Sequence, residues 1–171
     1  QSLEFSAYNS AIMSKALKCC SQLKELIIHN GADIHEDSEL FSESIDTLYI
    51  NSEFGFMSES ITMRFPNLRD LHVVGYGVLD GTFVGIVQHT TKLHRLSFDD
   101  TQGLTATSYA AIGQYCHSLE RLSVYDMSSS SRHLVDILPF TPLLKELILR
   151  HNENELDEIE VFERVAAHCP N

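Results

Sequence analysis

Cys116 and His117 are neighbours in the sequence, and a cysteine activated by a histidine is the nucleophile of many enzymes. Cys116 also lies three residues before Leu119, just as Cys20 lies three residues before Leu23. Other copies of this position hold residues of varied type, namely Ser42, Phe65, Thr90, Thr141 and Cys169. A position that accepts Cys, Phe and Thr is typical of a small packing site at the end of a helix. We therefore expect a buried thiol at Cys116 rather than a catalytic one.

The other motifs of catalysis are missing from the sequence. There is no GxxxxGK[ST], GxGxxG, HExxH, GxSxG or CxxC pattern, and no EF-hand loop. His72 and His94 could approach each other on neighbouring strands, but no third ligand converges on them, so no metal site is predicted. The sequence therefore predicts a protein that is not an enzyme and has no catalytic, cofactor-binding or metal-binding residues.

Arg95 and Arg121 have a type and a spacing that suit recognition. Each lies two residues after the first leucine of a short LxxLxL run, so on neighbouring strands they would be about 4.8 Å apart. Two adjacent guanidiniums could clamp a carboxylate or a phosphate of a target peptide. Alternatively, Asp70 and Glu146 could pair with them in a ladder of surface ion pairs. Both interpretations stay open, and we expect the first partner contact here.

Six short runs must position these side chains, each with apolar residues at its first, fourth and sixth positions. The runs begin at Leu23, Ile45, Leu68, Leu93, Leu119 and Leu144, at spacings of 22, 23, 25, 26 and 25 residues. An LxxLxL core with a period in this range is typical of leucine-rich repeats. The predicted fold class is an α/β leucine-rich repeat solenoid, a right-handed horseshoe with parallel strands on the concave face and helices on the convex face. We expect one domain over residues 1–171 with about six repeats, truncated at both ends.

The alternation within each run predicts which side chains meet a partner. Fourth and sixth positions should point into the core, and third and fifth positions to the concave face. Tyr49 and His72 are neighbouring fifth-position residues, and exposed aromatic side chains often dominate binding energy at interfaces. The alternative is an ordinary mixed surface. The predicted partner-binding residues are Tyr49, Asp70, His72, Arg95, Arg121 and Tyr125.

Helical spacing of apolar residues occupies the segments between the runs. We expect helices over residues 7–18, 79–89, 104–115 and 156–168, and shorter ones over 55–64 and 132–138. The last of these should end at Pro139, which cannot continue a helix. Asp80 or Thr82 should cap the helix over 79–89.

Charge and cysteine usage limit the partners and the compartment. The formal net charge is −12, which argues against nucleic acid and against an anionic membrane surface. No apolar run approaches the length of a transmembrane helix. Unpaired cysteines without any Asn-x-Ser/Thr site suggest an intracellular protein, cytoplasmic or nuclear. An acidic stretch over residues 153–163 is expected to be a solvated convex face, with recruitment of a basic partner as the alternative.

The residues from Ile112 to Leu122, and from Val165 to Asn171, resemble the cysteine-containing leucine-rich repeats of F-box proteins. Those repeats commonly have Cys, Pro, Asn and Leu where the chain enters the strand. The resemblance implies the substrate-recognition domain of a Skp–cullin–F-box ubiquitin ligase. It implies a protein target on the concave face and a Skp-type adaptor bound only through an F-box that these residues do not contain.

Two other functions stay open. One is an intracellular leucine-rich repeat regulator of another enzyme, similar to a GTPase activator or a ribonuclease inhibitor. The other is an enzyme whose catalytic domain lies outside these residues.

The ninth repeat position, which often holds Cys or Asn in F-box repeats, fits that pattern only at Asn152.

Overall fold

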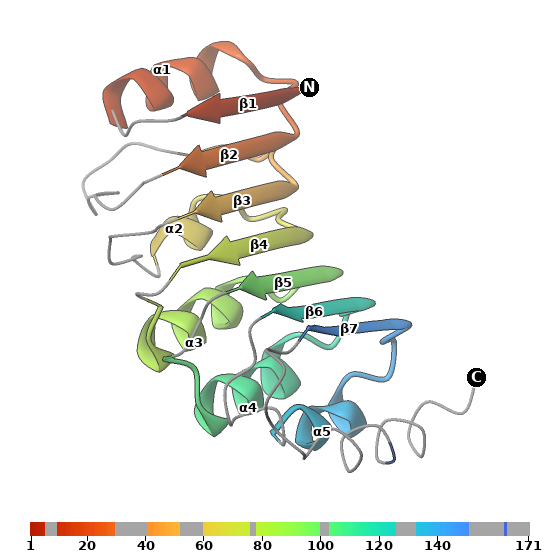
Figure 1. The fold of residues 1–171 in the computed structure, drawn as a ribbon. Helices are drawn as coiled ribbons and strands as arrows, with labels where there is room; N and C mark the ends of the chain where they lie inside the picture. Colours follow the sequence, from red (N-terminus) through yellow and green to blue (C-terminus); the bar gives the residue numbers. More distant parts are fainter. Residues whose placement is uncertain are drawn as a thin grey trace.

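A computed structural model describes residues 1–5, 10–29, 41–51, 60–75, 78–99, 103–125, 133–150 and residue 163. These residues form an α/β fold with a single parallel sheet of seven strands in the order β1-β2-β3-β4-β5-β6-β7. Each strand therefore pairs with its neighbours along the chain (Figure 1). The predicted parallel sheet is confirmed at this level.

Six of the strands occupy the third to seventh positions of the six runs. They are β2 (Glu25–His29), β3 (Thr47–Asn51), β4 (Asp70–Val74), β5 (Arg95–Asp99), β6 (Arg121–Tyr125) and β7 (Glu146–Arg150). Their register keeps equal positions side by side, since Leu48 pairs with Leu71 and Leu71 with Leu96. Because the register never slips, each position of the run becomes a straight column across the sheet.

A seventh strand, β1 (Ser2–Phe5), was not among the predicted runs. Leu3 and Phe5 pair with Leu26 and Ile28, so they take the fourth and sixth positions of a further run. Its first apolar position would fall one residue before Gln1, so the LxxLxL pattern is incomplete in the sequence.

The leucines of the runs build one continuous core under the sheet. From β2 to β6 the first, fourth and sixth positions are buried, as in Leu93, Leu96 and Phe98 of the run that forms β5, each at most 1% exposed. The corresponding residues of β1 and β7 are only partly buried. The Phe98 ring meets Phe83 of the helix layer edge-on at 5.4 Å between centroids, a geometry that aromatic pairs prefer. The core clusters strand and helix residues from Met13 to Ile137.

The helices agree with the predicted segments, with differences at their ends. They are α1 (Ser10–Cys19), α2 (Ser60–Met63), α3 (Asp80–His89), α4 (Ala106–Tyr115) and α5 (Leu134–Ile137). The α-helix stops before Pro139 as predicted, since α5 ends at Ile137. The expectation that all helical structure ends there was wrong, because a 3-10 helix, η2 (Leu138–Phe140), continues through this residue. Proline is tolerated there since the first residues of a helix need no N–H partner. The helix expected over 156–168 lies outside the described residues.

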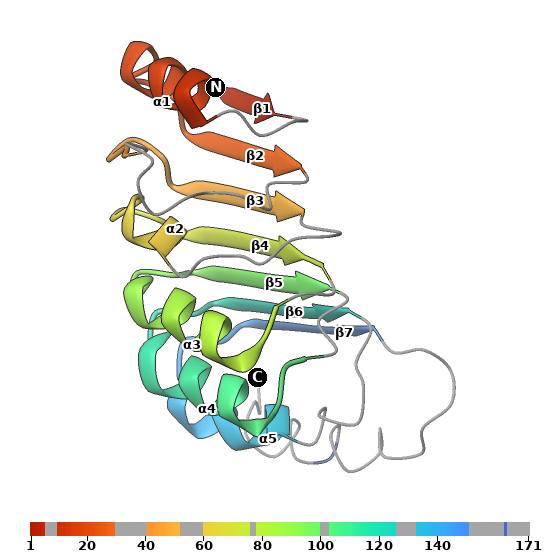
Figure 2. The ribbon, with the colours of Figure 1, turned by 90° about the vertical axis from the view of Figure 1, so that its left-hand side faces the viewer.

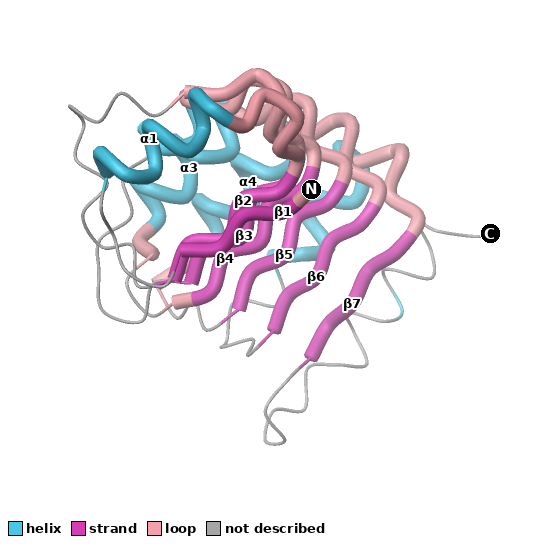
Figure 3. Tube along the Cα trace, turned by 90° about the horizontal axis from the view of Figure 1, so that it is seen from above, coloured by secondary structure: helices cyan, strands magenta, loops and turns pink. Residues whose placement is uncertain are grey.

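All the described helices lie on one side of the sheet (Figure 2). From above, strands and helices form two layers, and the strands turn progressively from β1 to β7 (Figure 3). No described element covers the other side of the strands. We call this side the open face; it carries the third, fifth and seventh positions of each run.

The predicted capping role of Asp80 was also wrong. Leu79 is the N-cap of α3 and makes no side-chain cap hydrogen bond. The Asp80 carboxylate instead accepts hydrogen bonds from the backbone N–H and the hydroxyl of Thr105 and from the hydroxyl of Ser108. Asp80 therefore connects α3 to the first turn of α4.

Candidate protein-binding face

The six predicted partner-binding residues all lie on the open face, on the four neighbouring strands β3 to β6. All six line one hollow of about 390 Å³. Its lining also includes the small side chains of Ser97 and Ser123, which pair in register. Larger side chains surround these serines, so the hollow can accept a side chain of a partner.

Tyr49 and His72 form a stacked pair at one side of the hollow. Their ring centroids are 4.4 Å apart with an angle of 14° between the planes, and both side chains are half-buried. Burial lowers the pKa of His72, and the carboxylate of Asp99 only partly opposes this effect. His72 is therefore neutral at neutral pH, and the stack offers a flat surface of little charge.

The two arginines lie side by side, and each is held by an acidic neighbour. Arg95 pairs with Arg121 in register. Arg95 Nη1 donates to Asp70 Oδ2 at 3.1 Å, and Arg121 Nη2 donates to Glu146 Oε1 at 2.5 Å. This is the ion-pair ladder, the second of the two predicted arrangements. A clamp would have to use the N–H groups that these single contacts leave free.

The ion pairs differ in their electrostatics. Burial raises the pKa of Asp70, and Arg95 only partly offsets this effect. The hydrogen bond to Glu146 raises the pKa of Arg121. The arginine side chains remain 63% and 44% exposed, so both guanidiniums are fixed in position and still reachable by a partner.

Tyr125 is a seventh-position residue at the other side of the hollow. The guanidinium of Arg150 on β7 lies 5.2 Å from the centroid of its ring, a distance suited to a cation–π contact. Arg150 was not among the predicted partner-binding residues. Its signal was the seventh-position column, which places it directly beside Tyr125.

A second missed pair extends the open face towards β1. His29 Nε2 lies 3.0 Å from Glu4 Oε1, and the His29 ring is 6.1 Å from Tyr49. Glu4, His29, Tyr49 and His72 thus form a continuous row across four strands. The incomplete β1 run hid the first member of this row.

The cysteine position behaves as predicted at Cys116 and differently at Cys20. Cys116 is fully buried, and burial raises the pKa of its thiol to about 12, so no thiolate forms at neutral pH. Cys20 is exposed, so the packing prediction was wrong there. Cys20 follows α1, at the end of the helix layer, where neighbours on one side are lacking among the described residues. Cys169 lies outside those residues.

The remaining candidates give no site in the part of the chain that is described. No three His, Cys, Asp or Glu residues within it are arranged to hold a metal ion. His94 lies just before β5, and its Nδ1 is 2.8 Å from the carbonyl of Lys92. Of the acidic stretch over 153–163, only Glu163 is described. No helix within the described ranges is long and apolar enough to span a membrane.

Comparison with known proteins assigns no family. No protein-family model matches the sequence, and no curated protein matches it.

Proposed function

We propose that the chain is a leucine-rich repeat solenoid and that its open face holds a protein target. The observation that carries the proposal is the sheet itself, which is entirely parallel and strictly sequential and, among the described residues, has helices on one side only. Parallel sheets normally have both faces covered. A parallel sheet with one open face is typical of repeat proteins, which use that face for binding.

The period of the sequence supports the same proposal. Successive strands begin 22 to 26 residues apart, enough for one strand, one return segment and two turns. The LxxLxL positions fill the interior from β2 to β6 and pack against it at β1 and β7, as leucine-rich repeats require. The repeat number and the horseshoe shape belong to this proposal.

The role of the face is argued from its side chains. The Tyr49–His72 stack and the Tyr125–Arg150 pair lie on either side of the serine-lined hollow. Tyr and Arg are enriched among the residues that dominate binding energy at interfaces. We assign the stack the role of anchor, and the two arginines that of orienting charged groups of the target.

The resemblance of the repeats to those of F-box proteins extends the proposal to a ligase. The chain would then hold the substrate of a Skp–cullin–F-box ubiquitin ligase, and its mechanism would be positioning. A Skp-type adaptor would bind residues outside this chain. No catalytic group is needed for this role.

The test compares partners captured by three forms of the full-length protein, measured by quantitative mass spectrometry. The Tyr49→Ala/His72→Ala variant should lose the target by about tenfold or more, because the anchor is removed. A control, Gln88→Ala/Gln114→Ala, changes two exposed residues of α3 and α4 and should retain it. Equal capture by all three forms would refute the open face as the binding surface.

The same experiment tests the ligase assignment separately. A Skp-type adaptor and a cullin should be captured by all three forms, because the substitutions lie away from any F-box. If the open-face variant loses the target and none of the three forms captures an adaptor, the result would favour the alternative function, a leucine-rich repeat regulator of another enzyme.

A further inference from the structure

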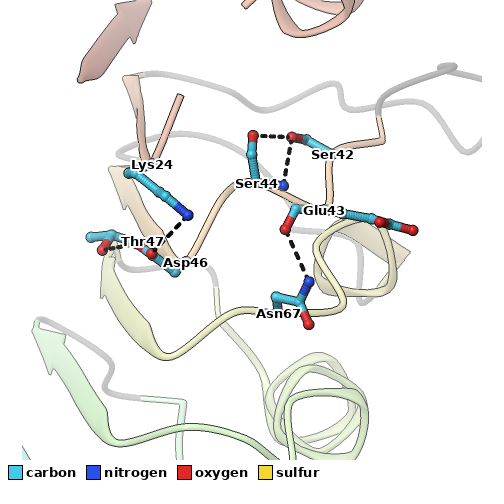
Figure 4. Close-up of polar contacts among 7 residues, drawn as sticks. All are labelled: Lys24, Ser42, Glu43, Ser44, Asp46, Thr47 and Asn67. Atoms are coloured by element: carbon cyan, nitrogen blue, oxygen red, sulfur yellow. Dashed lines mark hydrogen bonds and ion pairs between the residues drawn. The ribbon is translucent and has the colours of Figure 1, made fainter. Parts of the chain in front are cut away.

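A second hollow lies away from the open face, at the edge of the sheet where the strands start. Its volume is about 410 Å³. We call it the edge pocket, and it is lined by Lys24, Glu43, Ser44, Asp46, Asn67, Arg69 and Lys92. Figure 4 shows most of these residues on the turns that lead into neighbouring strands. Three of the 12 lysines and arginines of the chain line this one pocket.

Backbone hydrogen bonds hold in place the residues whose side chains line the edge pocket. Each second-position carbonyl accepts two N–H groups from the next run: Lys24 accepts from Asp46 at 3.0 Å and from Thr47 at 3.1 Å. The Asp46 carbonyl likewise accepts from Arg69 at 2.8 Å and from Asp70 at 2.9 Å. The side chains of Lys24, Asp46 and Arg69 therefore leave the backbone in one row across neighbouring strands. The distance between the strands sets the distance between them.

The three cations keep donors that no described residue uses. Lys24 Nζ is 3.7 Å from Asp46 Oδ2, an ion pair too long to be a hydrogen bond. Lys92 Nζ donates one hydrogen bond, to Asn67 Oδ1 at 2.9 Å. The guanidinium of Arg69 makes no hydrogen bond or ion pair with any residue in the described part of the chain. All three side chains are exposed.

The acidic residues of the pocket cancel only part of this positive charge. Asp46 accepts a hydrogen bond from the Thr47 hydroxyl at 3.1 Å, and Glu43 is exposed. Asn67 Nδ2 donates to the backbone carbonyl of Glu43 at 2.9 Å, which joins two successive turns (Figure 4). Three cations against two carboxylates leave a local excess of one positive charge, in a chain whose net charge is −12.

We propose that the edge pocket binds an acidic, extended segment of a partner protein. Lys24 and Arg69 start strands that are two apart, so their backbones are separated by about 10 Å. In a polyproline II segment, which rises about 3.1 Å per residue with three residues per turn, acidic residues at i and i+3 lie on one side about 9 Å apart. One carboxylate would meet Lys24 and the next would meet Arg69 and Lys92. This surface is separate from the open face and does not depend on the function proposed for it.

The experiment is a titration of the ¹⁵N-labelled chain with two peptides, followed by NMR. The peptide EPPEPPE has acidic residues at i and i+3, and EEEPPPP has the same composition without this spacing. EPPEPPE should cause saturable shifts at the amides of Lys24, Arg69 and Lys92. It should bind at least about threefold more tightly than EEEPPPP, because only its carboxylates match both cation positions.

Two triple variants distinguish specific binding at the edge pocket from non-specific electrostatic attraction to the chain. Lys24→Gln/Arg69→Gln/Lys92→Gln should weaken EPPEPPE binding by about tenfold or more. Lys15→Gln/Lys18→Gln/Lys145→Gln makes the same change in net charge elsewhere and should leave binding within about twofold of the wild type. Circular dichroism checks the fold, and Arg69→Gln alone, with an expected loss of about threefold, serves if the triple variant unfolds.

Three results would overturn the proposal. One is an equal loss of binding in both triple variants, and another is the absence of saturable shifts. The third is a set of shifts centred on His72 and Arg95, which would move the peptide to the open face. None of these results would affect the open-face proposal, because that rests on a different set of side chains.

Discussion

At the residue scale, the spacing of the runs was enough to place charged neighbours. Because third positions align across the sheet, Asp70, Arg95, Arg121 and Glu146 had to form one row, and the structure shows two ion pairs within it. Spacing alone could not choose between a clamp and a ladder, because the choice depends on side-chain rotamers. The Tyr49–His72 stack was predicted as a pair of neighbours, but its parallel geometry was not.

Reversing the charge of both arginines tests their role at the open face. Arg95→Glu together with Arg121→Glu would place four carboxylates in one row, and like charges directly opposite each other on a sheet repel. We expect partner binding to fall by about tenfold or more while the fold is kept, because both side chains face solvent. Binding is measured by titration calorimetry, and folding by circular dichroism.

The control for this variant is Lys15→Glu/Lys18→Glu, which makes the same change in charge on the exposed side of α1. It should bind the partner with affinity close to that of the wild type. Undiminished affinity in the arginine variant would exclude the two guanidiniums from the binding surface.

At the element scale, the strands and the long helices were predictable and their ends were not. The LxxLxL pattern placed six strands because each strand repeats the same buried positions. β1 was not predicted because the sequence contains only part of its run. Asp80 showed a different limit: its sequence position suits the cap of its own helix, but its carboxylate satisfies the first turn of the following helix. Only packing between repeats decides such contacts.

The connection from Asp80 to α4 should stabilise the fold in a pH-dependent way. Burial opposes ionisation of this carboxyl, but hydrogen bonds from Ser108 and Thr105 outweigh that effect and hold the pKa of Asp80 below its ordinary value of 3.8. A group with a lowered pKa in the folded state contributes its stability above the unfolded pKa. That contribution is lost as the pH falls through the folded pKa.

Asp80→Asn should therefore lower the free energy of unfolding by about 1.5 kcal/mol or more at pH 7, because hydrogen bonds to a charged group are stronger than those to a neutral amide. The difference from the wild type should shrink as the pH is lowered from about 4 to about 2. Urea denaturation across this range measures it. Glu43→Gln, an exposed carboxylate, is the control and should have little effect. A difference that stays constant with pH would mean that the charge of Asp80 does not support α4.

At the scale of the whole molecule, the described part of the fold leaves one side of the sheet uncovered, and the sequence does not name a partner for it. The leucines of the runs pack in the core, so the residue types on the open face can differ from one run to the next. The net charge of −12 coexists with a cationic edge pocket, which shows that local placement rather than total charge decides what each surface can bind. The identity of a target lies in side-chain combinations that no periodicity encodes.

The central claim is that a protein target covers the open face. Hydroxyl-radical footprinting with mass spectrometry tests it directly, because it measures the solvent exposure of individual side chains with and without the captured target. Tyr49, His72 and Tyr125 should become protected when the target binds. Ile12 and Phe140, which are 59% and 58% exposed beside the helix layer, should keep their reactivity. Protection of Ile12 and Phe140 with unchanged labelling of Tyr49 and His72 would contradict the account, because the target would then bind the helices.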